Sequence, residues 1–195
     1  MYKYVLLPII FVISFTQCTN KKNNAAVNTP AADTTVFFPV NDFIKNDIKD
    51  VQQNPYHIYK ITSHKPGKRD SVTISVDDFI LLADLFLKKD ITMQPLKSIF
   101  KESVFHDLTT KSITLLYATT DSASDIKNVT VLLDDKNNKP KRIFIRSYFN
   151  KGDYFLNEQL NWKIGKSFQI IRSIFGNNRK NSEEETTIIW NDKSY

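Results

Sequence analysis

The tripeptide Gly165-Lys166-Ser167 has the residue types that close a phosphate-binding P-loop. A P-loop also needs a glycine five residues before Gly165, because successive backbone amides must face the phosphates. That position is Leu160, and the following segment, Ser167–Phe175, alternates like a strand where a P-loop would begin a helix. We therefore interpret the tripeptide as a turn between strands.

Two acidic segments have the composition of cation sites but not the spacing. In Asp134-Asp135-Lys136-Asn137-Asn138, a lysine stands where a calcium loop needs its third-position oxygen ligand, and no glycine follows at the sixth position. A hairpin turn explains this segment. Glu183-Glu184-Glu185 is predicted to be a solvated strand edge that discourages pairing with other chains.

The three histidines, His57, His64 and His106, have none of the spacings of a zinc site, and the chain has no Gly-x-Ser-x-Gly segment. The pair His106-Asp107 with a distant serine is the one catalytic arrangement that the sequence would hide. We find no catalytic, metal-binding or cofactor-binding constellation, and we predict that the protein is not an enzyme and uses no cofactor.

Cys18 is the only cysteine, so the chain can form no internal disulfide. It follows Val5–Phe15, an uncharged run of eleven residues with Lys3 before it. Such a run is a signal-peptide core and is too short to span a bilayer. The position of Cys18 resembles a bacterial lipobox, which predicts a signal peptide over residues 1–17 and lipidation of Cys18, although Phe15 and Gln17 depart from the pattern. An ordinary secretory signal is the alternative.

Residues 18–36 are predicted to be a flexible tether, because Thr19–Thr35 is rich in Asn, Thr, Ala and Lys and has no helical or strand period. No acidic cluster follows Cys18, and Thr19 is not an inner-membrane retention aspartate. We therefore expect a protein anchored in the cell envelope by palmitate or a similar acyl chain, on the periplasmic face of the outer membrane.

Composition is that of one globular domain, predicted over residues 37–195. The chain has 195 residues, 41% hydrophobic and 25% charged, with a formal net charge of +6. The densest basic runs, Lys65–Arg69 and Lys136–Arg142, fall in predicted loops, whereas nucleic-acid binders cluster their bases on one face. We expect no nucleic-acid partner.

Two helices are predicted near the start of this domain. Asn41–Gln53 has apolar residues at helical spacing after Asn41 or Asp42 as a cap. Ser75-Val76-Asp77-Asp78 has a capping-box pattern and precedes a helix of about twelve residues that closes near Lys88-Lys89.

The rest of the domain is predicted to form strands. Tyr56–His64 and Ser71–Ile74 are expected to make a hairpin, and six further segments after Phe100 alternate with a period of two. Short connections separate these segments, the last being Gly176–Ser182, and short connections join antiparallel neighbours. The predicted fold class is α+β: a curved antiparallel β-meander of about eight or nine strands, with two N-terminal helices packed on one face. Its aromatic residues are expected to form the core; the alternative is that they line a cavity.

The segment Gln159–Ile170, together with Phe37-Phe38-Pro39, resembles a family of small uncharacterised lipoproteins of Bacteroidota. The resemblance would span most of residues 36–191. It implies an envelope location and brings no activity, ligand or site residue.

These observations favour a lipid-anchored, non-enzymatic accessory protein of the cell envelope that binds an envelope protein or component. The alternative is a periplasmic carrier or chaperone for an apolar ligand such as a lipid or acyl chain, with an architecture like that of the periplasmic carriers that shuttle lipoproteins. The alternative requires an apolar cavity of at least a few hundred Å³ between helices and sheet.

Overall fold

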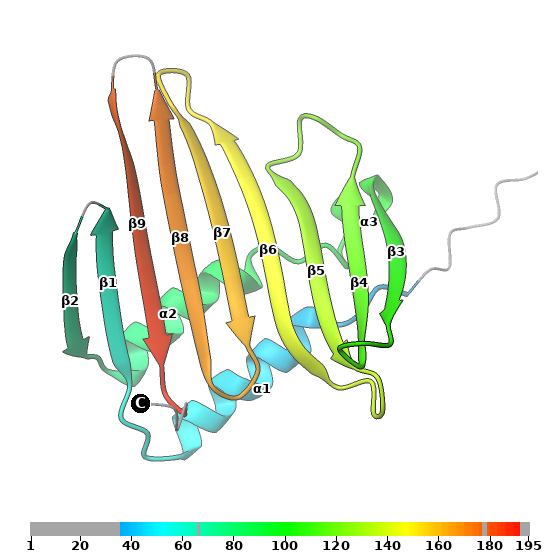
Figure 1. Cartoon of the computed structure of the whole chain (residues 1–195), viewed down its shortest axis with the longest axis horizontal. Helices are drawn as coiled ribbons and strands as arrows, with labels where there is room; N and C mark the ends of the chain where they lie inside the picture. Colours follow the sequence, from blue (N-terminus) through cyan, green and yellow to red (C-terminus); the bar gives the residue numbers. More distant parts are fainter. Residues whose placement is uncertain (1–35, 66, 177–178, 192–195) are drawn as a thin grey trace, which may run out of the picture. The chain divides into compact units, whose positions relative to one another are not determined.

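The computed structural model describes residues 36–65, 67–176 and 179–191, which form one antiparallel sheet with helices on one face (Figure 1). The helices are α1 (Val40–Gln53), α2 (Val76–Leu87) and the short α3 (Leu96–Ile99). The strands are β1 (Tyr59–Lys65), β2 (Lys68–Thr73), β3 (Phe100–Asp107), β4 (Ser112–Thr119), β5 (Ile126–Asp134), β6 (Pro140–Asn150), β7 (Phe155–Lys163), β8 (Ser167–Gly176) and β9 (Arg179–Ile189).

The strands from β3 to β9 follow one another as a meander, and the β1–β2 hairpin joins the sheet by pairing β1 antiparallel to β9. The resulting order is β2-β1-β9-β8-β7-β6-β5-β4-β3 (Figure 1). Among the described residues the sheet stays open, with β2 and β3 at its two edges. The α+β class, the antiparallel meander within a sheet of nine strands and the two N-terminal helices are confirmed.

Alternation along the strands places one set of side chains against the helices. This set forms a core with α1 and α2, whose buried apolar residues include Ile44, Ile48, Val51, Phe79, Ala83 and Phe86. At its centre the rings of Trp162 and Phe168 stack with centroids 4.8 Å apart, and Phe86 meets Trp162 edge-on at 4.9 Å. These aromatic side chains are core, as expected, and they fill the middle of the helix–sheet interface.

The start of α2 agrees with the sequence, whereas the start of α1 does not. The Ser75 side chain accepts a hydrogen bond from the Asp78 amide, and the Asp78 carboxylate accepts one from the Ser75 amide, which completes the predicted capping box. Helix α1 begins at Val40 without a side-chain cap. Asn41 instead donates from Nδ2 to the Leu87 carbonyl and to Asp90, which joins the start of α1 to the end of α2.

Three details of the strand prediction were wrong. Strand β3 was not among the six alternating segments predicted after Phe100. Only Phe100 of its eight residues is buried, so neither face of the strand carries a row of core residues. The predicted connection Gly176–Ser182 is shorter, since β9 already begins at Arg179. The basic run Lys65–Arg69 is not all loop, since β2 begins at Lys68, and the run Lys136–Arg142 extends into β6.

The predicted signal peptide, Cys18 and nearly all of the tether lie outside the described residues. Within residues 36–65, 67–176 and 179–191, no helix is both long and apolar enough to cross a bilayer.

Candidate functional site

Two adjoining hollows lie at the C-terminal end of α2. The larger has a volume of about 510 Å³ and is mostly apolar; its lining is Lys88, Lys89, Pro95, Leu96, Ile99, Asp121, Ala123, Ser124, Asp125, Ile126 and Phe149. The smaller has a volume of about 270 Å³ and is lined by Leu85, Lys88, Lys89, Phe149, Lys151, Leu156, Glu158 and Arg172. Because both share Lys88, Lys89 and Phe149, we treat them as one feature, the α2-end groove.

Glu158 stands on the wall of the groove and is buried, with its side chain 6% exposed. Its side chain points from β7 toward the helices. The residues on the same face of the strand, Leu156 and Leu160, are apolar. Lys89 Nζ lies 3.1 Å from one carboxylate oxygen and Arg172 Nε lies 2.8 Å from the other. One buried carboxylate thus holds two cations, which joins the end of α2 to β7 and β8.

Phe149 gives the groove an aromatic surface that contacts two cations, Lys89 and also Lys151. Lys89 Nζ lies 4.9 Å from the centre of its ring and Lys151 Nζ lies 5.3 Å from it. Lys88 is exposed and pairs with Asp84, one turn earlier in α2, at 2.6 Å.

The charge of the groove is divided between its two halves. The smaller hollow is lined by four cations and by Glu158 as its one carboxylate. The larger hollow adds two carboxylates, Asp121 and Asp125, from the β4–β5 connection, but most of its lining is apolar. One end of the groove therefore suits an anion and the other suits a hydrocarbon chain.

A second buried carboxylate, Asp47 of α1, does not line either hollow of the α2-end groove. Its Oδ2 accepts a hydrogen bond of 2.7 Å from Trp162 Nε1 and one of 2.8 Å from the Gly165 amide. Burial raises the pKa of Asp47 above its ordinary value, and these two hydrogen bonds offset only part of that effect. Asp47 thus fastens α1 to the turn between β7 and β8.

This contact explains the Gly165-Lys166-Ser167 tripeptide. Gly165 has φ of +69°, a conformation that glycine adopts without strain, and its amide faces the carboxylate of Asp47 where a P-loop amide would face a phosphate. The Lys166 carbonyl accepts hydrogen bonds from the amides of Trp190 and Asn191. The tripeptide is a turn between strands, as predicted.

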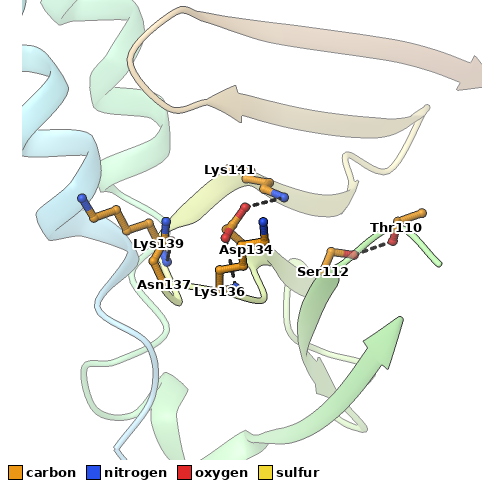
Figure 2. A network of polar contacts seen from close by, with 7 residues as sticks. All are labelled: Thr110, Ser112, Asp134, Lys136, Asn137, Lys139 and Lys141. Atoms are coloured by element: carbon orange, nitrogen blue, oxygen red, sulfur yellow. Dashed lines mark hydrogen bonds and ion pairs between the residues drawn. The ribbon is translucent and has the colours of Figure 1, made fainter. Parts of the chain in front are cut away.

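The Asp134 segment is also a turn between strands, and Asp134 and Asn137 accept hydrogen bonds from backbone amides within it (Figure 2). The Asp134 carboxylate accepts from the Lys136 amide and pairs with Lys141 Nζ at 2.9 Å. These contacts, the Lys141 hydrogen bond first, hold the pKa of Asp134 below its ordinary value. Nearby, the hydroxyls of Thr110 and Ser112 lie 2.7 Å apart (Figure 2).

The glutamate run Glu183-Glu184-Glu185 does not form a sheet edge, and that prediction was wrong. Strand β9 pairs with β8 on one side and with β1 on the other. Glu184 pairs with His64 of β1 at 3.5 Å, and Glu185 accepts a hydrogen bond from Gln169 of β8. The run therefore contributes contacts between neighbouring strands.

The fold does not gather the three histidines. His64 lies in β1 and His106 lies in β3, seven strands further along the sheet order, while His57 precedes β1 and is exposed. Among the described residues there is no group of three or more His, Cys, Asp or Glu side chains placed to hold a metal ion.

Sequence reasoning noted Lys88-Lys89 only as helix-ending cations and did not find the groove. A signal was present, because Glu158 occupies an inward position in the alternating pattern of β7. A charged residue at a core position needs a partner, but its partners Lys89 and Arg172 come from two other elements.

Comparison of the chain with protein-family models, with curated proteins and with solved structures gave no match.

Proposed function

We propose that this protein is a lipid-anchored, non-enzymatic binding protein of the cell envelope, and that the α2-end groove is its binding site for an anionic amphiphile, such as a fatty acid. The observation that carries the proposal is the pairing of a cationic hollow with a mostly apolar one across Phe149. The anchor at Cys18 remains the prediction made from the sequence.

The geometry favours a carrier that binds its ligand in a groove at the end of α2 over one that encloses it between the helices and the sheet. Aromatic core residues occupy the middle of the helix–sheet interface, so the ligand site lies at the end of α2. The larger hollow is within the range of sizes of small-molecule sites. A chain lying there would contact Leu96, Ile99 and Ile126, and its acidic group would reach Lys88 and Lys151.

The contacts of the cations leave the groove with positive charge to offer. Glu158 has one negative charge for two cations, Lys89 and Arg172. Lys151 lies over the Phe149 ring, and Lys88 is exposed beside Asp84. An anion placed between Lys88 and Lys151 would form charge-assisted hydrogen bonds without displacing the buried pair.

Binding is tested by titrating the protein with palmitate by calorimetry. The double substitution Lys88→Glu with Lys151→Glu is expected to weaken palmitate binding at least about tenfold, since two like charges would then face the acid and each lost charge-assisted contact is worth about 1.5–3 kcal/mol. The matched control is Lys139→Glu with Lys166→Glu, which changes the net charge equally at exposed turns outside the groove. If both double variants weaken palmitate binding equally, the effect is due to the net charge of the protein, which would contradict the proposed site.

The apolar half is tested separately by chain length. Ala123 lines the larger hollow, so Ala123→Phe is expected to fill part of it and to weaken palmitate more than octanoate. Native mass spectrometry of protein purified from membranes should show a co-purified acidic lipid. Absence of such a lipid, together with no palmitate binding, would exclude the carrier version.

The anchor has its own test. Cys18→Ser is expected to release the protein from the membrane fraction and to abolish incorporation of labelled palmitate. Retention of this variant with membranes would contradict the proposed anchor, but it would not bear on the proposed binding site in the groove.

A further inference from the structure

Strand β3 is an open edge of the sheet. Within the described residues it pairs with β4 alone, and seven of its eight residues are exposed. Val104 and Phe105 are 59% and 57% exposed. A long exposed edge strand with apolar residues is a template for pairing with another strand.

The charges of β3 are complementary to the same strand read in reverse. In the segment Lys101-Glu102-Ser103-Val104-Phe105-His106-Asp107, Val104 is the midpoint. If a second copy pairs antiparallel about that midpoint, each Lys101 faces Asp107 and each Glu102 faces His106. We propose that two copies of this chain pair β3 with β3 about Val104, which joins their sheets into one continuous sheet.

The faces of the sheet are compatible with this pairing. Glu102, Val104 and His106 are registered with Tyr117, Leu115 and Ile113 of β4, whose side chains lie on the helix-facing side. Lys101, Ser103, Phe105 and Asp107 therefore point to the other side. A two-fold axis normal to the sheet reverses the strand direction but leaves each side chain on the same face of the sheet. The two members of each pair named above therefore lie on the same face as each other.

The carboxylates of Asp107 and Glu102 are available for the pairing. Hydrogen bonds from Thr110 and Thr109 hold the pKa of Asp107 below its ordinary value, so this carboxylate is ionised at neutral pH. Glu102 accepts from the Tyr117 hydroxyl through Oε1, which leaves Oε2 for a partner. On the opposite face, Phe105 and its symmetry mate are diagonal neighbours within reach of each other.

Neighbouring registers lack this complementarity. A midpoint at Glu102 places two carboxylates opposite each other, and midpoints at Ser103 or Phe105 place no opposite charges together. At the other edge of the sheet, β2 paired with itself about Asp70 opposes two carboxylates, and about Ser71 it places no opposite charges together. About Arg69 it pairs Lys68 with Asp70 but opposes two guanidinium groups at the midpoint. Like charges directly opposite destabilise a strand pair, so β3 is the edge suited to a second copy.

The proposal is tested by disulfide trapping. In full-length protein that carries Cys18→Ser, the Val104→Cys substitution would introduce the only cysteine, and it faces itself across the two-fold axis. Opposed residues in an antiparallel pair have Cα atoms about 4.5–5.5 Å apart, a spacing that a disulfide spans. Mild oxidation is expected to convert Val104→Cys to a covalent dimer. The control is Val72→Cys in β2, which is likewise on an edge strand and 48% exposed. Equal dimer yields from both sites would overturn the proposal.

Charge reversal in mixed copies provides the second test, again in the Val104→Cys background. Lys101→Glu alone places its new carboxylate opposite Asp107 twice in each homodimer, and Asp107→Lys alone places its new ammonium group opposite Lys101 twice. Each variant alone is expected to lose most of its cross-linking, whereas an equimolar mixture should restore it as a heterodimer in which all four positions are complementary. This mixture also controls for damage to the Asp107 turn. Failure of the mixture to exceed the separate variants would overturn the pairing.

Discussion

Asp47 and Glu158 are both carboxylates buried between the helices and the sheet, but they have different partners. Asp47 accepts hydrogen bonds from two neutral donors, an indole and a backbone amide. Glu158 holds two cations at the wall of a groove. Neutral donors satisfy one carboxylate within the core, whereas cations in excess of the carboxylate create a surface that can bind an anion. A buried carboxylate therefore supports packing at Asp47, whereas at Glu158 it lines the groove that we propose as a binding site.

The largest expected effect is at Asp47. Asp47→Ala would leave the buried Trp162 Nε1 and the Gly165 amide without an acceptor, which we expect to lower the free energy of unfolding by about 3 kcal/mol. Urea denaturation measures it. Asp42→Ala, on an exposed position of the same helix, is the control and should change stability by less than about 1 kcal/mol. A small effect at Asp47 would remove the contrast between the two carboxylates.

A smaller effect is expected at Lys89. Lys89→Met removes one partner of Glu158 while Arg172 remains, so we expect a loss of about 2 kcal/mol of stability. Palmitate binding should weaken as well, because the cationic half of the groove loses a charge. Lys88→Met, which removes an exposed cation paired only with Asp84 in its own helix, should change stability by less than about 0.5 kcal/mol. If Lys89→Met lowers stability but leaves palmitate binding unchanged, then Glu158 and its cations serve packing alone, as Asp47 does.

The smallest expected effect is a pH dependence, which follows from the raised pKa of Asp47. A raised pKa means that the folded state binds the proton more tightly than the unfolded chain does. The stability gained in this way is fully present below the ordinary pKa of aspartate and is lost as the pH rises through the raised value. The difference in the free energy of unfolding between wild type and Asp47→Asn should therefore shift against the wild type as the pH rises from below the ordinary pKa of aspartate through the raised value. A shift in its favour would show that the neutral donors outweigh burial.

The capping box shows what short-range sequence could predict. Ser75 and Asp78 are three residues apart, so their mutual hydrogen bonds depend on local backbone geometry alone, and the start of α2 was predicted correctly. The same holds for the turn at Gly165, which was identified as a turn by its neighbours. Its acceptor was not predicted, because Asp47 is 118 residues away along the chain.

Strand β3 shows why part of the sheet was missed. Alternation becomes visible in a sequence only when one face of a strand is buried, and β3 buries Phe100 alone. Its charge pattern was present in the sequence, but the sequence did not show that β3 lies at an edge, where this pattern can face a second copy.

The sequence by itself determined the secondary structure and the class of fold, because apolar periodicity, capping and turn residues act over a few neighbouring residues. The tertiary structure decided the candidate sites. Lys89, Glu158 and Arg172 meet only because the end of α2 lies beside β7 and β8, and β3 becomes an edge only because the β1–β2 hairpin adds to the opposite side of the meander. Contacts between residues far apart in the chain depend on how the layers pack, which no local pattern specifies.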